Sequence, residues 1–183
     1  MPLKFISILT ISFLVFQNIH ANDSTKYFRS YYTNNVIKSE GWLVNGEKNE
    51  WWKEYYKNGQ LKSIGQYSYG LKTGWWKELF SNGTIHFEGA FKEGEKNGYW
   101  KFNFANGNIM AEGYFLKDVK QGYWIYYDSN GSKIAEGTYT SGTMDDYWKF
   151  YEKGIIKREG MYEMGKKTGY WHFYNPDKLL NYD

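Results

Sequence analysis

The sequence predicts an all-β protein, folded as an elongated single-sheet antiparallel meander of about six tandem β-hairpin repeats of ~24 residues each. Three observations carry this prediction: a tryptophan recurs at a nearly constant interval, glycines recur in step with it, and glycine-containing turns separate short strand-like segments. Aromatic residues make up 22% of the chain and only two residues are proline, which favours strands over disorder.

The tryptophan column sets the period, because its members are separated by 24, 24, 24, 24 and 23 residues. The column consists of Trp52, Trp76, Trp100, Trp124, Trp148 and Trp171. A glycine column keeps step inside the apolar segments, at Gly41, Gly65, Gly89, Gly113, Gly137 and Gly160. These two sets are the expected structural columns of a stacked repeat.

The unit at residues 98–121 shows how one repeat divides into elements. A segment reading Gly-Tyr-Trp-Lys-Phe-Asn-Phe and a segment reading Asn-Ile-Met-Ala-Glu-Gly-Tyr-Phe flank Asn106-Gly107, which predicts a β-hairpin. The motif Gly-x-Lys-x-Gly at residues 70–74 and 94–98 predicts the tight connection between units. Two strands and two turns fill the unit, so the chain is expected to form about twelve strands.

The pairing register follows from arithmetic, because opposed residues in an antiparallel pair have a constant index sum. Around the Asn-Gly turn the expected pairs are Trp100 with Gly113, Lys101 with Glu112, and Phe104 with Ile109. Around the next connection they are Gly113 with Trp124 and Phe115 with Gly122, and by the period Phe91 with Gly98, Tyr67 with Gly74, and Tyr162 with Gly169. Each column glycine then lies between two tryptophans, whose rings can cover its bare backbone.

The same register places a second row on the opposite face of the sheet. The row consists of Lys53, Ile64, Lys77, Glu88, Lys101, Glu112, Ile125, Glu136, Lys149, Glu159 and His172. Its charges alternate in sign, and opposite charges on neighbouring strands stabilise a sheet by about 0.2 to 1 kcal/mol per pair. The row is therefore expected to fix the pairing register of neighbouring strands.

Residues 1–21 have the layout of a secretory signal peptide: a lysine near the start, an apolar run over residues 5–16, and a polar stretch that ends at Ala21. The run is too short for a membrane-spanning helix, which needs roughly 20 residues. We expect export to the periplasm, the outer surface or the medium after cleavage near Ala21. The expected divisions after it are a leader segment at 22–30, the repeat domain at 31–177 and a tail at 178–183.

The composition argues against several classes of partner and of site. Removal of residues 1–21 leaves 22 Lys and Arg against 20 Asp and Glu, a net charge of +2, so no nucleic-acid partner is expected. The chain has no cysteine, which excludes disulfides and thiolate metal sites.

Candidate catalytic residues are lacking in the sequence as well. After removal of the leader, the histidines are His86, expected to face Leu79, and His172, expected to face Glu159. They lie in different repeats, and no Ser-His-Asp set or phosphate-binding glycine loop accompanies them. We therefore expect no enzyme, no catalytic residues, no metal site and no cofactor.

The recurring motifs resemble MORN repeats, in particular the bacterial variant often named as an antitoxin-like component. Gly-Tyr-Trp, Asn-Gly, Glu-Gly-x-Tyr and Gly-x-Lys-x-Gly carry the resemblance, which covers about residues 31–175. It implies a scaffold, a self-association module or a membrane-proximal adaptor. Three residues depart from the pattern: Ile64 stands where glutamate recurs, and Asp118 and Asp146 stand where glycine recurs.

Tyr99, Tyr114 and Tyr123 form the candidate interaction surface, since the register places them in one cross-strand row beside the charges. The leading hypothesis is a non-enzymatic scaffold outside the cytoplasm that binds a protein partner or itself. A second hypothesis is a module that binds glycans or another cell-surface ligand by stacking them on the tyrosines. A membrane-surface adaptor or an antitoxin-like component is the third, and the near-zero net charge disfavours membrane contact.

Overall fold

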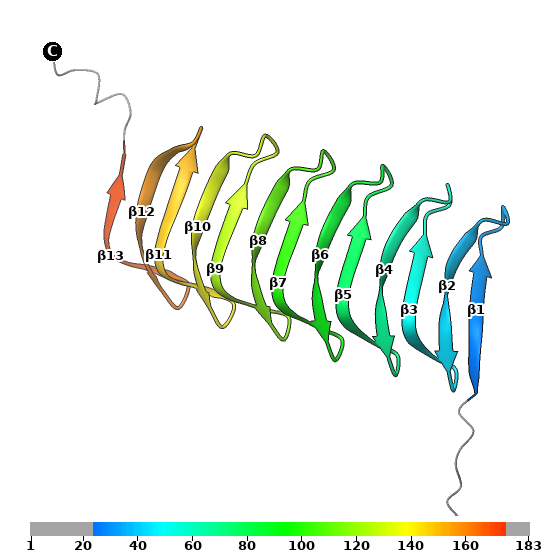
Figure 1. Ribbon diagram of the computed structural model, residues 1–183. Coiled ribbons are helices and arrows are strands. Elements are labelled where there is room, and N and C mark those ends of the chain that lie inside the picture. The colour runs from blue at the N-terminus through cyan, green and yellow to red at the C-terminus, as the bar shows by residue number, and fades with distance from the viewer. Residues whose placement is uncertain (1–23, 175–183) are drawn as a thin grey trace, which may run out of the picture.

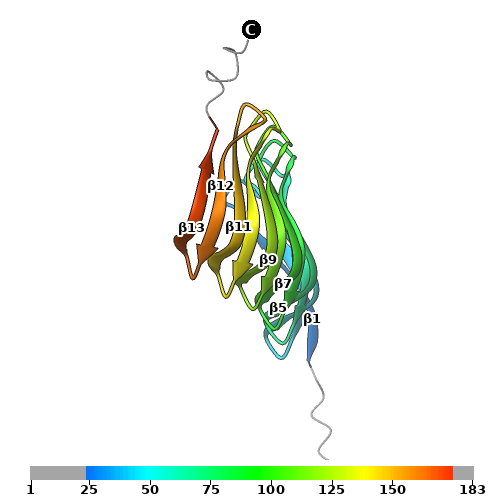
Figure 2. The same ribbon diagram turned by 90° about the vertical axis from the view of Figure 1, so that its left-hand side faces the viewer.

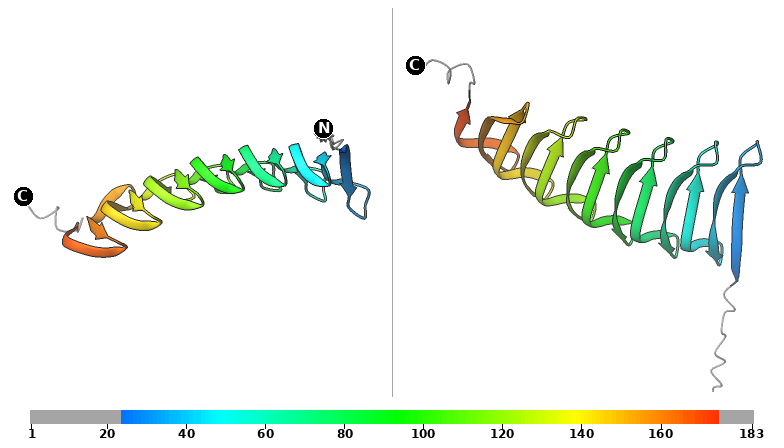
Figure 3. Two further views of the ribbon diagram at one scale, coloured as in Figure 1. Left: turned by 90° about the horizontal axis from the view of Figure 1, so that it is seen from below. Right: turned by 45° about the horizontal axis from the view of Figure 1, so that its top comes forward.

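The computed structural model describes residues 24–174, which form thirteen β-strands and no helix. The strands are β1 (Thr25–Tyr31), β2 (Ile37–Val44), β3 (Glu47–Tyr55), β4 (Leu61–Ser68), β5 (Leu71–Leu79), β6 (Ile85–Lys92), β7 (Glu95–Asn103), β8 (Ile109–Leu116), β9 (Val119–Tyr127), β10 (Lys133–Thr140), β11 (Thr143–Glu152), β12 (Ile155–Glu163) and β13 (Lys166–Phe173). Each pairs with its sequence neighbours in one open sheet, an elongated row of hairpins (Figures 1 and 3). The predicted all-β meander is confirmed.

The sheet begins at Thr25, within the segment 22–30 that the sequence analysis left outside the repeat domain. Strand β1 resembles the odd-numbered strands in sequence, with Phe28 in the tryptophan position and paired with Gly41. Arg29 pairs with Glu40, as Lys53 does from the other side. The predicted signal peptide at 1–21 and the predicted tail at 178–183 lie outside the described residues.

Two kinds of turn alternate along the sheet. At the Asn-Gly turns the chain closes over three residues, and the Oδ1 atom of Asn106 accepts a hydrogen bond from the backbone N–H of Asn108 at 3.0 Å. The Asn106 amide also donates to the carbonyl of Ser129 in the next repeat at 2.7 Å. The other turns are two-residue turns such as Glu93-Gly94, whose φ values of 53° and 85° match the twist of a hairpin.

The predicted register holds at the centre of each strand and fails toward the ends. Trp100 pairs with Gly113, Lys101 with Glu112, and Gly113 with Trp124, as expected. The predicted pairing of Phe104 with Ile109 is wrong, because a bulge after Phe102 brings Asn103 opposite Ile109. The pairings of Phe115, Phe91, Tyr67 and Tyr162 with glycines across the two-residue turns are also wrong; their partners there are Lys120, Lys96, Lys72 and Lys167.

In each odd-numbered strand from β3 onward, a residue with positive φ causes the register shift next to the two-residue turn. Such a residue forms a bulge, which adds one residue to its strand and displaces every later pair. The column consists of Glu50, Gly74, Gly98, Gly122, Asp146 and Gly169, with φ between 58° and 86°. Asp146 therefore keeps the backbone that glycine has elsewhere in the column. Asp118, at φ 63°, likewise keeps the conformation of the turn glycines.

The tryptophan column forms the core. Trp100, Trp124 and Trp148 are at most 1% exposed. Each indole lies on the column glycine of the preceding strand, where an added Cβ would be 2.2–2.5 Å from its Cδ2 atom. The indole N–H groups of the 24-spaced members from Trp52 to Trp148 donate to carbonyls at 2.8–3.1 Å. Trp171, which follows the 23-residue interval, has a buried Nε1 without a hydrogen-bond partner.

The strands are bowed (Figure 2), and contacts over the indoles place the tryptophan column on the concave face. Side chains six residues apart on one strand meet across the indoles: Lys48 Nζ is 3.4 Å from Glu54 Oε1, and Lys120 Nζ is 2.7 Å from the Tyr126 hydroxyl. Between the tryptophans, Tyr67, Phe91, Phe115, Tyr139 and Tyr162 make edge-to-face contacts with centroids 5.0–6.3 Å apart. A continuous aromatic core in the bowed face replaces the second layer that a sheet normally needs.

We predict that deletion of one whole unit, residues 102–125, leaves a folded protein. The cut joins Lys101 to Tyr126 at equivalent positions, so the merged strand keeps later pairings in phase. Stability in such arrays is roughly a sum of unit and nearest-neighbour terms. The melting temperature should stay within about 4 °C of wild type. Circular dichroism melting tests this, and an unfolded deletion variant would show that the units are not equivalent.

Candidate functional site

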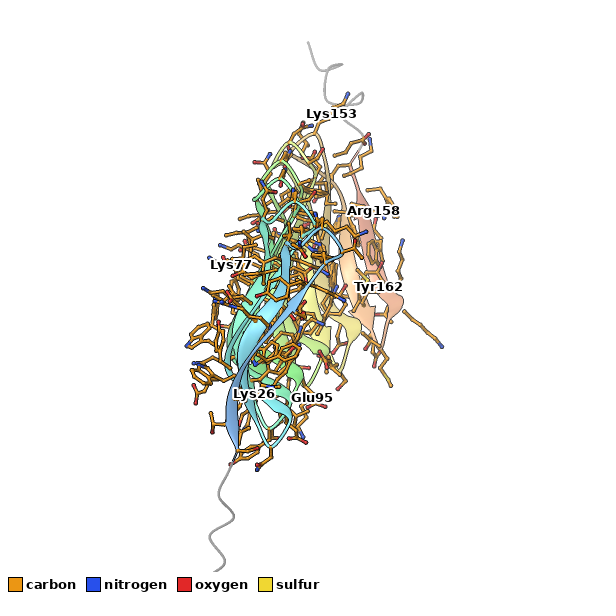
Figure 4. All side chains as sticks on the ribbon, turned by 90° about the vertical axis from the view of Figure 1, so that its right-hand side faces the viewer. Lys26, Lys77, Glu95, Lys153, Arg158 and Tyr162 are labelled. Carbon is orange, nitrogen blue, oxygen red and sulfur yellow. The ribbon has the colours of Figure 1, made fainter. Side chains whose placement is uncertain are left out.

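The convex face carries the predicted charged row. Every neighbouring pair from Lys53 to His172 occupies opposed positions, which confirms the register of this face. The row also extends backward through Glu40 to Arg29, whose Nε is 2.9 Å from a carboxylate oxygen of Glu40. Seen from the β1 end, Lys77 lies on one side of the sheet and Tyr162 on the other (Figure 4).

The predicted tyrosines lie beside the charged row, and the structure brings only part of the set together. Tyr99 and Tyr114 are directly opposed, with ring centroids 5.3 Å apart, and are 40% and 55% exposed. Tyr123 is 52% exposed but pairs with Thr138, because the bulge in β9 brings Gln121 opposite Tyr114. The three rings therefore share a face without forming one continuous row.

A longer row of exposed aromatic residues was missed from the sequence. On each odd-numbered strand from β3, the residue before the column tryptophan is aromatic and points to the convex face. These residues, with Tyr27, Trp42 and Tyr114, form what we call the aromatic row: Tyr27, Trp42, Trp51, Trp75, Tyr99, Tyr114, Tyr123, Tyr147 and Tyr170, which are 39–80% exposed. The doublet Trp-Trp or Tyr-Trp in every unit is the signal that could have revealed it.

Carboxylates of the charged row hold many of these tyrosines in place. The Tyr99 hydroxyl donates to Glu112 at 2.6 Å, and the Tyr127 hydroxyl donates to the same carboxylate at 3.0 Å. The arrangement recurs as Tyr27, Glu40 and Tyr55, as Tyr123, Glu136 and Tyr151, and as Tyr147, Glu159 and Tyr174. We call each set a tyrosine clamp. A clamp fixes the orientation of a tyrosine ring on the convex face, so the side chain loses less rotamer entropy when a partner binds.

The departure at Ile64 makes sense within this pattern. Its repeat has Trp51 and Leu79 where the clamps have tyrosines, so all three members are apolar together. No side chain of that set carries a hydroxyl, and none offers an acceptor. The set at Glu88 is intermediate, with Trp75 and Asn103 beside it, and this carboxylate lies 3.7 Å from Lys77 Nζ.

Comparison with known protein families finds the MORN repeat variant in three segments, residues 52–69, 96–117 and 120–140. These three segments match MORN repeats. The last two segments are the hairpins β7–β8 and β9–β10, which confirms the resemblance predicted from the motifs. No curated protein matches the chain. MORN repeats suggest a repeat scaffold or a binding module.

Within residues 24–174, no group of three or more His, Cys, Asp or Glu side chains could hold a metal ion, and no helix is long and apolar enough to cross a membrane. His172 faces Glu159 as predicted, but His86 does not face Leu79, whose partner is Ile85. A bulge displaces His86, so its Nδ1 lies 3.3 Å from Glu78.

A pocket of about 320 Å³ lies at the β1 end of the convex face, lined by Tyr27, Glu40, Trp42, Glu50, Trp51 and Lys53. Its walls mix aromatic surface with both signs of charge. Such a surface can dock apolar and hydrogen-bonding groups of a partner together. The aromatic row and the charged row, from Arg29 to His172, are together called the ridge below.

The clamps set the protonation behaviour of the ridge. Burial, with the hydrogen bond to a glutamate, raises the pKa of Tyr55, Tyr123 and Tyr127 to about 12. Burial alone would raise the pKa of Glu136, but hydrogen bonds from Lys133 and two tyrosines lower it overall. The hydrogen bond from Tyr55 is the main cause of the lowered pKa of Glu40.

These shifts predict a loss of stability in base. A tyrosine whose pKa is raised in the folded state stabilises the fold fully below its unfolded value of about 10. The stability is lost as the pH rises from 10 toward 12, because the unfolded chain releases the proton first. Melting temperatures should fall steeply over this range. Tyr127→Phe should make the fall shallower, and an unchanged profile would contradict the clamps.

Proposed function

We propose that this chain is a non-enzymatic scaffold that acts outside the cytoplasm and binds a protein partner, or a second copy of itself, through the ridge. The aromatic row carries the proposal, because Trp51 and Trp75 keep 50% and 51% of their surface exposed in the folded chain. Large exposed aromatic side chains gathered on one face mark interaction sites, and tryptophan and tyrosine dominate the binding energy of interfaces.

The ridge has two further properties of a binding surface. Clamped tyrosines keep their orientation, so binding does not have to order them. The charged row beside the rings supplies polar contacts of both signs, as the rim of an interface does. A convex ridge, in contrast, encloses no substrate, which supports a scaffold over an enzyme.

The layout of residues 1–21 supports a site of action outside the cytoplasm, and a chain without cysteine needs no disulfide there. We predict that the mature protein begins at Asn22 and is found in an envelope or extracellular fraction. N-terminal sequencing of protein purified from each fraction tests this. A cytosolic pool that retains Met1 would overturn the placement.

Capture from envelope extract tests the binding role. Wild-type protein on a resin should retain a partner that Trp51→Ala with Trp75→Ala loses. The control is Tyr69→Ala with Met164→Ala, which changes side chains 77% and 81% exposed in turns outside the ridge. Sedimentation with polysaccharide and with anionic vesicles should give no pellet. Ridge-dependent pelleting with polysaccharide would replace this proposal with the glycan hypothesis.

A further inference from the structure

We infer that the ridge binds a second copy of this chain face to face, around a two-fold axis that runs parallel to the strands between β6 and β7. This inference rests on the proposed binding role of the ridge and names its partner. In this arrangement β6 of one copy lies over β7 of the other, β5 over β8, and so on outward to β1 over β12.

The order of charges along the row supports the arrangement. From Arg29 to Glu159 the row reads plus, minus, plus, apolar, plus, minus, plus, minus, apolar, minus, plus, minus. Read backward with the signs inverted, the pattern is the same. Strict alternation alone would give complementary signs, but it would not place the apolar positions symmetrically. Ile64 and Ile125 lie on the fourth strand and the ninth, which the two-fold axis superimposes.

The same axis gives specific contacts at its centre. Lys77 lies over the partner's Glu112, and Glu88 lies over the partner's Lys101. Lys77 and Glu88 side chains are 37% and 23% exposed, so they can reach across. A two-fold axis along the length of the sheet would instead set every charge over its own copy, which is repulsive. Electrostatics therefore selects one of the two symmetric face-to-face arrangements.

The aromatic row fits the same operation. Trp75 lies over the partner's Tyr114, and Tyr99 lies over the partner's Ala90, a ring over the small side chain next to the axis. Farther out, Trp51 lies over the partner's Thr138. Large residues thus meet small ones at two of these positions, and the contacts near the axis include Trp75 and Tyr99. Aromatic anchors near the centre of an interface are the usual hot spots.

The size of the ridge is adequate for a dissociable dimer. Its part from β1 to β12, which the axis pairs, spans eleven strand spacings of ~4.8 Å and is about 53 Å long. A covered strip roughly 15 Å wide, which two side-chain columns 6–7 Å apart and their flanks occupy, would bury about 800 Å² per copy. That area is near the standard for specific complexes, so association should depend on concentration.

Sedimentation equilibrium over a range of concentrations tests the association. Wild type should show a monomer–dimer equilibrium. Trp75→Glu, which puts charge under the partner's Tyr114, and Ala90→Tyr, which fills the space over Tyr99, should each weaken it roughly tenfold or more. Tyr69→Glu and Met164→Glu, in turns outside the ridge, should dimerise as wild type does. Melting curves establish that every variant is folded.

Engineered cysteines test the register, because the chain has none of its own. Face-to-face sheets lie about 10 Å apart, so a bifunctional thiol reagent that spans about 10 Å should link Ile64→Cys on one copy to Ile125→Cys on the other when the two proteins are mixed. Either variant alone should remain uncross-linked, since its two cysteines would be five strand spacings apart, about 24 Å, beyond the reach of the reagent. A direct disulfide, which requires Cα atoms within roughly 7 Å, is not expected across the interface.

Each outcome decides between the two proposals. Reagent cross-links in the single variants, or none in the mixture, would overturn this arrangement. A wild-type chain that is monomeric at all concentrations would overturn the second copy as partner. If that monomer still captures a different protein through Trp51 and Trp75, the proposed binding role stands; if it captures nothing, both fall. Ridge-dependent pelleting of the monomer with polysaccharide would assign the ridge to a glycan instead.

Discussion

Gly89→Ala is expected to destabilise the fold by about 1 to 3 kcal/mol, although alanine is the smallest possible addition. The added Cβ would lie 2.3 Å from Cδ2 of Trp100, far inside contact distance. The indole cannot retreat, because it is fully buried and its N–H donates to the carbonyl of Ala90 at 3.1 Å. Urea unfolding monitored by circular dichroism measures the loss.

Trp100→Ala is expected to cost more, about 3 to 5 kcal/mol, because it empties a fully buried site. Together the two changes form a double-mutant cycle. In the Trp100→Ala background, Gly89→Ala should cost almost nothing, since the ring that it clashes with is gone. The coupling between the two sites should therefore nearly equal the whole cost of Gly89→Ala in wild type.

Gly107→Ala is the control for the glycine cycle. A Cβ added at Gly107 would have no atom within 4 Å. The φ of Gly107 is +91°, however, and alanine is strained in this backbone conformation. It should cost roughly 1 to 2 kcal/mol through the backbone alone, with no dependence on Trp100. Equal costs for Gly89→Ala with and without Trp100 would mean that the indole does not lie on the glycine.

The sequence predicted the central register because alternation and the index sums are properties of the strand itself. The pairs of Trp100 and Lys101 depend only on an antiparallel turn near Asn106, whatever its detailed shape. The bulges could not be predicted in the same way. Glu50 and Asp146 adopt positive φ without being glycine, so composition does not reveal that they add a residue to their strands.

The ridge was predicted in part. Tyr99, Tyr114 and Tyr123 were found because they flank the charged row, while Trp51 and Trp75, which directly precede column tryptophans, were not singled out. The clamps were missed because the register inferred from the sequence already pairs these glutamates with lysines on neighbouring strands, so no further partner was sought. That Glu112 instead accepts bonds from two tyrosines depends on side-chain reach across strands, which no spacing rule specifies.

Glu136→Lys is expected to destabilise the fold by about 3 kcal/mol, because it reverses the charge of a clamp residue that is only 8% exposed. The new ammonium would face Lys149 across the strand and Lys133, whose Nζ now lies 2.6 Å from the carboxylate. Tyr151 would also lose the acceptor of its hydroxyl. Thermal melts near neutral pH should show the loss, and added salt should recover part of it.

The chain itself supplies the matched control, since its second repeat replaces the clamp by Trp51, Ile64 and Leu79. Glu136→Ile alone removes the acceptor of two hydroxyls and should cost about 1 to 3 kcal/mol. The triple variant Tyr123→Trp, Glu136→Ile and Tyr151→Leu copies the apolar set and should return to within roughly 1 kcal/mol of wild type, since apolar replacement of a whole polar network is nearly neutral. If the triple variant is as unstable as the sum of its single changes, the clamp and the apolar set are not interchangeable, and the pattern at Ile64 needs another cause.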